Sequence, residues 1–192
     1  MTHWNQTKLN QSTFPERIIV AETQTKGKGR LGRHWYSPPG NLYMTLIKNV
    51  SVDFIKLPQL SLVVGLSVYH VLKSYISENH HVSLKWPNDI LVDGKKLGGI
   101  LIETDFDENK ESTICYIGIG LNRLSAPETI SYPTTCLLNY SSTPPEINDL
   151  VSQIADELDR MFLHAHCLTC QRNRNSRYCN LNSHIILQSK NF

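Results

Sequence analysis

The chain has 192 residues, of which 40% are hydrophobic and 19% are charged, and its formal net charge is +2. This composition is typical of one globular domain with a proper core, and it excludes a disordered or fibrous chain. A net charge so close to zero argues against a general nucleic-acid binder, because phosphate contacts need many clustered cations.

The N-terminus carries no cationic segment followed by an apolar core, so the sequence predicts no signal peptide and a cytoplasmic protein. The most apolar run, residues 57–76, is interrupted by polar side chains and indicates a core helix rather than a membrane span. Five cysteines in a chain without an export signal are expected to stay reduced.

The first half of the chain alternates predicted strands with breaks. Residues 1–12 are polar and indicate the end of a helix, residues 17–23 have strand composition, and residues 24–40 form a long loop rich in Gly and Pro. A second strand is expected at residues 41–49, and Pro58 suits the first turn of a helix buried on most sides. The apolar residues of that helix recur at helical spacing: Leu60, Val64, Val68, Val71, Leu72 and Tyr75, with Leu62, Val63 and Leu66 widening the stripe.

The second half of the chain continues with strands that follow one another directly. Alternation in residues 82–86 predicts a strand that ends at Pro87, Asp93-Gly94 is a hairpin signal, and residues 97–103 form the next apolar strand. Further segments are expected in this order: a strand at 113–122, a loop-rich stretch at 126–145, a surface helix at 146–166 and a short strand at 185–187. This succession predicts an α+β fold with a mixed, largely antiparallel sheet and helices on one face.

The hairpin at Asp93-Gly94 brings cations close to an amide and an anion. Lys95 and Lys96 follow the turn, and Asn88 and Asp89 precede it. A cation and an anion at the mouth of an apolar strand pair indicate a site, because folding alone does not need both. A solvated turn with charged residues is the alternative interpretation.

The loop at residues 24–40 contains Gly27, Gly29 and Gly32 in a G-x-G-x-x-G pattern after a strand. No helix can follow it, so a dinucleotide site is excluded, and no Gly-Lys-Ser/Thr ends it as in a Walker A loop. The segment instead combines flexible glycines with cations and aromatic rings, so it could close over an anionic ligand or form a basic RNA-binding surface. Its charged and aromatic members are Lys26, Lys28, Arg30, Arg33, Trp35 and Tyr36.

Four segments of the chain form a recognisable series: residues 24–38, residues 41–43, residues 85–89 with 96–101, and residues 118–122. In order and spacing they resemble the catalytic domain of biotin protein ligases, over roughly residues 17–165. The pairing of the basic Gly loop with Lys-Trp-Pro-Asn-Asp is the most specific feature, since lipoate ligases share the fold without that pair. The resemblance implies a fold of the class II aminoacyl-tRNA synthetase and biotin synthetase type.

The resemblance also implies a two-step reaction with ATP, biotin and Mg²⁺. Biotin attacks the α-phosphate of ATP to give biotinyl-adenylate and pyrophosphate, and a lysine amine of a biotin carrier domain then attacks the mixed anhydride. The implied partner is the biotin carboxyl carrier protein of acetyl-CoA carboxylase or another biotin-dependent carboxylase. Neither DNA nor a membrane is an expected partner, and the chain is expected as a monomer or a homodimer formed through a sheet edge.

Family position assigns a role to each matching residue. Lys96 and Arg30 are the implied catalytic residues, with Lys96 touching both the biotin carboxylate and the α-phosphate. Asp89 either orients Lys96 or holds Mg²⁺ through water. The implied biotin-binding residues are Gln24, Lys28, Gly29, Arg30 and Lys96. The implied nucleotide-binding residues are Arg30, Arg33, Trp35, Asn88 and Asn122, with Trp35 against the adenine.

The chain departs from the family pattern at Lys28 and at both ends. Lys28 stands where the family usually has arginine and offers no bidentate fork. Thr2 alone could replace the Ser/Thr-Thr-Asn segment that bonds the biotin ureido ring, so the alternatives are a binding protein for biotin or its adenylate with weak or no ligase activity, or an unstable remnant. The resemblance therefore implies a monofunctional catalytic domain, shortened at both ends, at residues 1–170. A tail at 171–192 would begin an SH3-like barrel, and no helix-turn-helix is present to support a repressor role.

A group of cysteine and histidine residues near the C-terminus is a weaker candidate. Cys-x-x-Cys with a further cysteine and histidines could bind zinc, but a second Cys pair is missing. Reduced, partly buried thiols are the favoured interpretation. The group comprises His164, His166, Cys167, Cys170, Cys179 and His184.

Overall fold

Seven strands in the computed structural model form one sheet, in the order β3-β4-β5-β6-β2-β1-β7. The structure describes residues 16–50, 57–105, 113–128, 132–170 and 184–186. The strands are β1 (Arg17–Ala21), β2 (Leu42–Val50), β3 (Val82–Lys85), β4 (Asp89–Val92), β5 (Lys95–Asp105), β6 (Thr113–Leu121) and β7 (His184–Ile186). The helices are α1 (Leu57–Lys73) and α2 (Ile147–Cys170), with 3-10 turns at Arg30–Gly32 and Leu137–Asn139.

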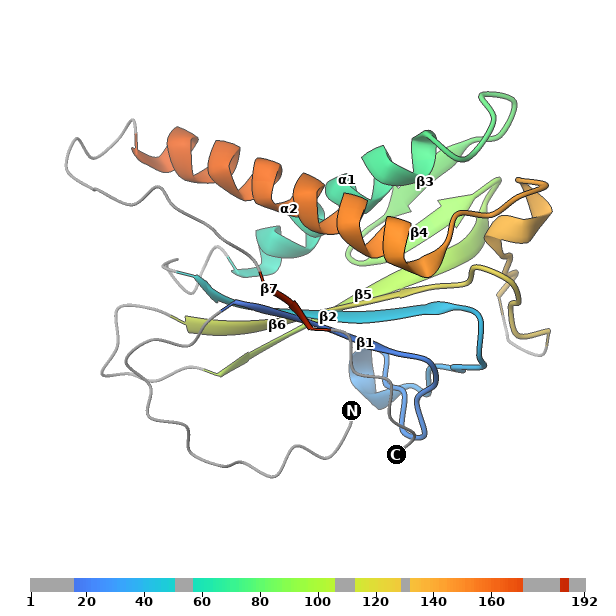
Figure 1. Cartoon of the computed structure of the whole chain (residues 1–192), viewed down its shortest axis with the longest axis horizontal. Coiled ribbons are helices and arrows are strands. Elements are labelled where there is room, and N and C mark those ends of the chain that lie inside the picture. The colour runs from blue at the N-terminus through green and yellow to red at the C-terminus, as the bar shows by residue number, and fades with distance from the viewer. Residues whose placement is uncertain (1–15, 51–56, 106–112, 129–131, 171–183, 187–192) are drawn as a thin grey trace.

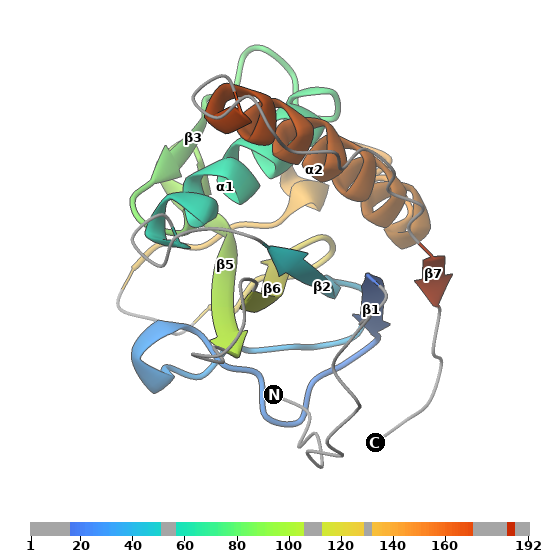
Figure 2. The same cartoon turned by 90° about the vertical axis from the view of Figure 1, so that its left-hand side faces the viewer.

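Alternating burial explains why the helices cover a single face of the sheet. In β6 every second residue from Thr113 to Leu121 is buried, and the buried positions of β2 and β5 lie beside them in the register. Both helices pack over this side, as Figures 1 and 2 show, while the loop at residues 24–40 lies on the opposite side. All neighbouring strands are antiparallel except β1 and β7. The predicted α+β fold with a mixed, largely antiparallel sheet is confirmed.

Two expectations about the helices were wrong in detail. Leu62 and Leu66 do not widen the buried stripe of α1 but are 41% and 38% exposed, because the sheet and α2 cover the other sides of this helix. α2 continues past residue 166 to Cys170. Neither α1 nor α2, the helices of the described part, combines the length and apolarity needed to cross a bilayer.

The ends of the chain fall largely outside the described residues. The helix end predicted for residues 1–12, Thr2 and most of the tail at 171–192 are among the residues left undescribed, as are the side chains of the Cys/His group. The short C-terminal strand is present one residue earlier than predicted, at His184–Ile186. It extends the sheet by pairing in parallel with β1.

One charged side chain is buried on the helix-covered face. Lys48 of β2 is 5% exposed, and its Nζ lies 2.8 Å from Glu16 Oε1 and 3.4 Å from Asp159 Oδ1 of α2. The same ammonium stands 5.0 Å from the centre of the Phe162 ring. These contacts connect the start of β1, the sheet and α2 through a single cation.

Substitution of Lys48 by alanine is expected to lower the free energy of unfolding by about 3 kcal/mol, because it leaves the largely buried Glu16 carboxylate without its cation. Urea denaturation of the variant and the wild-type chain measures this difference. A loss of about 0.5 kcal/mol or less, the size expected for an exposed ion pair, would contradict the structural role of this cation.

Candidate active site

Two glycines form a flat shelf on the sheet face opposite the helices. Gly99 of β5 and Gly120 of β6 are register partners, and the Trp35 ring from the loop lies against both. A Cβ atom at Gly120 would stand 2.9 Å from the indole Nε1, and one at Gly99 would stand 3.3 Å from the ring Cζ3. We call Gly99 and Gly120 the glycine shelf, since the ring approaches the backbone this closely only where side chains are absent.

Lys96 lies beside the glycine shelf with its charge partly enclosed. Its Nζ is 2.7 Å from Asp89 Oδ1, and the side chain is 13% exposed. The ammonium also lies 5.4 Å from the centre of the Trp35 ring and 5.3 Å from that of Tyr132. An opposite charge and two aromatic rings therefore hold one cation in a defined place.

The backbone of Lys96 is fixed as well as its side chain. Its N–H donates to Pro133 O at 2.9 Å, and its carbonyl accepts from the Thr135 N–H at 2.9 Å. The segment that contains Tyr132 is thereby attached to the beginning of β5. Because both its backbone and its side chain are held, the Lys96 ammonium needs little reorganisation when negative charge develops nearby.

Arg30 of the loop reaches the block that contains Asp89. Its guanidinium lies 3.5 Å from Asn88 Oδ1, the outer limit of a hydrogen bond. Asn88 is itself fixed, because its Nδ2 donates to Ile100 O at 2.8 Å and its carbonyl accepts from the Ile100 N–H at 2.9 Å. Lys96 also faces Trp35, which belongs to the same loop as Arg30, so Arg30 and Lys96 lie on the same side of the sheet.

The loop at residues 24–40 has an internal structure of its own. The Gly29 N–H donates to Arg33 O at 2.7 Å, and the Trp35 N–H donates to Gly27 O at 2.9 Å. Gln24 lies at its base, where its Oε1 accepts from Ser37 Oγ at 2.9 Å. The predicted lack of regular structure holds apart from a short 3-10 turn at Arg30–Gly32.

The remaining predicted site residues are placed differently from one another. Asn122 is 3% exposed, and its Nδ2 donates to Thr135 O at 3.0 Å, so it lies against the segment that flanks Lys96. Lys28 and Arg33 are exposed on the loop, and Gly29 is half-buried.

Two features of the site have no signal in the sequence. Tyr132 comes to Lys96 from a loop-rich stretch in which no periodicity or motif marks it. The buried indole Nε1 of Trp35 is the one buried side-chain nitrogen or oxygen among the described residues that lacks a hydrogen-bond partner. A donor left unpaired beside an enclosed cation marks a place where a polar ligand group or a ring movement would restore a bond.

The alternatives for Asp89 differ in what the geometry supports. Its carboxylate oxygen bonds Lys96, which matches the orienting role. Among the described residues no group of three or more His, Cys, Asp or Glu side chains could hold a metal ion, so magnesium binding through Asp89 stays a prediction.

A hollow of about 690 Å³ lies along the segment attached to Lys96. Its lining includes Lys95, Tyr132, Thr134 and Asn139. Lys95 and Lys96 thus have different surroundings although they are neighbours: the side chain of Lys95 is exposed at this hollow, and that of Lys96 is enclosed.

Comparison with known proteins decides the family. The model of the Biotin/lipoate A/B protein ligase family matches residues 1–122, well over half of the chain. The chain belongs to this family. A bifunctional ligase/repressor BirA of Bacillus subtilis is 31% identical over 177 residues, which cover 89% of this chain and 50% of the relative. A biotin--[acetyl-CoA-carboxylase] ligase of Mycobacterium tuberculosis is 34% identical over 152 residues, covering 76% of this chain and 54% of the relative.

The fold of this ligase-family chain also matches solved structures. The biotin protein ligase of Aquifex aeolicus in complex with biotin and ATP superposes with a TM-score of 0.63 at 34% identity, over 75% of this chain and 59% of that one. The chain spans about half the length of the curated relatives described above.

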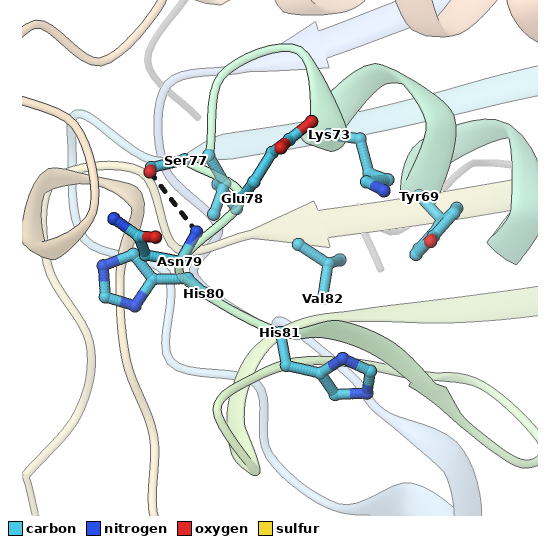
Figure 3. Close-up of a pocket in the computed structure, with 9 residues that line it drawn as sticks. Tyr69, Lys73, Ser77, Glu78, Asn79, His80, His81 and Val82 are labelled. Carbon is cyan, nitrogen blue, oxygen red and sulfur yellow. Dashed lines mark hydrogen bonds between the residues drawn. The ribbon is translucent and has the colours of Figure 1, made fainter.

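Figure 3 shows a second hollow of this ligase-family chain, of about 250 Å³, lined by α1 and the turn before β3. None of its lining residues belongs to the predicted site. His80 and His81 of this turn hold the Asp93 carboxylate: the His81 N–H donates to Oδ1 at 2.8 Å, and His80 Nδ1 lies 2.8 Å from Oδ2. The His81 N–H and then the His80 ring lower the pKa of Asp93 from its ordinary value of 3.8.

A carboxyl group whose pKa is lower in the folded than in the unfolded chain stabilises the fold at pH values above its unfolded-state pKa. This stabilisation is lost as the pH falls through its folded-state pKa. Asp93→Asn is therefore expected to reduce the acid sensitivity of the thermal midpoint as the pH falls through and below 3.8, the ordinary pKa of the carboxyl group, since the asparagine amide does not titrate. Melting curves of both chains across this range measure the effect. Parallel curves for variant and wild type would contradict it.

Proposed function

We propose that this chain is an ATP-dependent biotin protein ligase that activates biotin as biotinyl-5'-AMP and transfers it to a lysine of a biotin carboxyl carrier protein. The observation that carries the proposal is the meeting of Arg30 with Asn88 directly beside the Asp89–Lys96 pair. Two cations from distant segments thus contact consecutive residues, Asn88 and Asp89, which supports a role in the coupling of two anionic substrates.

The first step joins a carboxylate to a phosphate. A carboxylate oxygen of biotin forms a bond to the α-phosphorus of ATP, and the bond from that phosphorus to the bridging oxygen breaks to release pyrophosphate. Lys96 and Arg30 lower the repulsion between the two acids and stabilise the charge that develops on the phosphorus oxygens. Asp89 keeps the Lys96 ammonium in place, while Trp35 and Asn122 lie on the proposed nucleotide side.

The magnesium ion that accompanies ATP would neutralise phosphate charge, with Asp89 as the carboxylate proposed to hold it through water. The free oxygen lone pairs of a carboxylate already bonded to Lys96 fit such an outer contact.

Closure of the loop at residues 24–40 would exclude water and protect the anhydride from hydrolysis.

The second step transfers biotin from the adenylate to protein. A neutral lysine amine of the carrier attacks the anhydride carbonyl, the carbon–nitrogen bond forms, and the carbon–oxygen bond to AMP breaks as the amine loses a proton. The M. tuberculosis relative is named for acetyl-CoA carboxylase, which supports a carrier of that class. We assign this catalysis to the domain at residues 1–170, with no DNA or membrane partner, acting as a monomer or as a dimer formed through a sheet edge.

Incubation of the purified chain with biotin, ATP, Mg²⁺ and a carrier fragment tests the proposal. Mass spectrometry should find biotin on one carrier lysine, and pyrophosphate should be released in proportion. Calorimetry that finds biotin binding without pyrophosphate release would select the binding protein with weak or no ligase activity instead. The absence of both binding and labelling at saturating substrates would reject the two together.

A further inference from the structure

We infer that Asn41 and Arg123 are positioning residues: they hold the segment after β6, which begins with Asn122 of the proposed nucleotide side, against the end of the loop at residues 24–40. The inference rests on the proposed function, and it gives a role to Arg123 and to Asn41, which lies in the motif segment 41–43 but had no role assigned to it. Arg123 directly follows Asn122 at the end of β6, and Asn41 directly follows the loop at residues 24–40. We call the contacts between Gly40–Asn41 and residues 123–125 the loop joint.

Asn41 organises the chain where β6 ends. Its Oδ1 accepts three successive backbone N–H groups, from Arg123 at 2.9 Å, Leu124 at 2.9 Å and Ser125 at 3.2 Å. Its Nδ2 donates to Ser125 O at 2.9 Å. With 1% exposure, this single amide supplies the partners that four backbone groups would otherwise lack.

The Arg123 side chain bonds the end of the loop and the residues just before α2. Its guanidinium is 9% exposed, and Nε donates to Pro145 O at 2.5 Å. The terminal nitrogens lie 3.5 Å from Gly40 O, 3.5 Å from Pro144 O and 3.2 Å from Glu146 Oε1. The guanidinium therefore bonds carbonyls at the end of the loop and just before α2, together with the Glu146 carboxylate. These bonds hold the two segments together, so we do not expect Arg123 to bind an anionic substrate.

Gly40 completes the joint by shape. Its φ of +88° lies in the left-handed region that favours glycine, and a Cβ atom there would stand 2.7 Å from Leu124 Cδ1. The Gly40 carbonyl also accepts from the Arg123 guanidinium. Gly40 therefore contacts two residues of the segment after β6, Arg123 through a hydrogen bond and Leu124 through close packing.

The position of the joint explains what it controls. Asn122 precedes it, with its N–H donating to Leu97 O at 2.9 Å and its carbonyl accepting from the Leu137 N–H at 2.9 Å. The segment after it returns to Lys96 through Thr135. A shift at the joint would therefore displace Asn122 directly, whereas the Lys96 ammonium stays bonded to Asp89 and Gly29 keeps its bond to Arg33 within the loop.

The test compares Asn41→Leu with Asn41→Asp in biotin-dependent pyrophosphate release. Leucine removes every bond of the amide, and we expect the KM for ATP to rise about 10-fold or more while the KM for biotin changes by less than about 3-fold. Aspartate keeps the acceptor for three N–H groups and loses only the donor to Ser125 O, so its KM for ATP should rise clearly less than that of Asn41→Leu, by about 3-fold, and its KM for biotin should change by less than about 3-fold. Arg123→Lys keeps the charge but cannot reach the carbonyls together, and it should show the same split at about 3- to 10-fold.

Amide hydrogen exchange gives a readout that needs no turnover. Peptides covering residues 123–125 should exchange about 100-fold faster in Asn41→Leu and near the wild-type rate in Asn41→Asp. Equal increases in both KM values, or unchanged exchange in Asn41→Leu, would overturn the loop joint. Lack of ATP turnover by the wild-type chain with protected amides at 123–125 would instead reject the proposed function and, with it, the nucleotide role of the joint.

Discussion

Replacement of Lys96 by alanine should lower the rate of biotinyl-adenylate formation by about 10²- to 10³-fold, the usual loss when one group that stabilises developing charge is removed. The reason is the enclosed position of this ammonium, 2.7 Å from Asp89 and in contact with the rings of Trp35 and Tyr132. Single-turnover measurement of adenylate at saturating biotin and ATP separates this effect from weaker binding.

Lys95 provides the matched control for this experiment. It has the same side chain, belongs to the same hairpin and is exposed. Lys95→Ala should therefore keep the rate of adenylate formation within about 3-fold of wild type, since an exposed charge contributes little. Equal losses in the two variants would show that general positive charge, and not the mounting of Lys96, supports the reaction. Circular dichroism verifies that both variants are folded.

Substitution of Gly120 by alanine should weaken substrate binding about 5- to 150-fold, the range that corresponds to the cost of overpacking. The added Cβ would lie 2.9 Å from the indole nitrogen and 3.0 Å from ring carbon Cζ2, so the Trp35 ring has to leave the glycine shelf. Equilibrium dialysis with ATP and biotin measures binding, and the tryptophan fluorescence spectrum reports the displacement of the ring.

Gly99→Ala and Trp35→Leu make the Gly120 experiment selective. The Cβ of Gly99→Ala would lie at 3.3 Å, so a smaller loss is expected from that variant. Trp35→Leu combined with Gly120→Ala leaves room for the new methyl group, and the added substitution at Gly120 should then have little further effect. Additive losses in the double variant would contradict direct contact between ring and shelf as the cause.

The long strands of the sheet were predictable because they are apolar runs bounded by turn residues, which located β2, β5 and β6 to within a few residues. Burial alternates regularly only in β6, whereas β2 also buries residues of its other face. Periodicity could not show that Leu62 and Leu66 stay exposed, because it does not reveal on how many sides a helix has neighbours. The parallel pairing of β7 with β1 was likewise hidden, since sequence separation gives no register.

The candidate site was predictable only where residues form a motif. The glycines and cations of the loop, together with Lys96 and its neighbours, could be selected because their spacing is specific. Tyr132 and Arg123 depend on contacts between segments far apart in the chain. Asn41 belongs to the motif segment 41–43, but its role depends on such a contact as well, since it bonds the Arg123 backbone across 82 positions. A single asparagine or arginine carries no pattern from which such contacts can be inferred.

In the proposed reaction, Arg30 of the loop at residues 24–40 and Lys96 of β5 together couple two acids. Its most direct test is the exchange of labelled pyrophosphate into ATP by the wild-type chain, with and without biotin and without any carrier. Exchange that requires biotin, and that disappears in Lys96→Ala, is the expected result. Wild-type exchange no greater than that of Lys96→Ala at saturating biotin and ATP would contradict the claim.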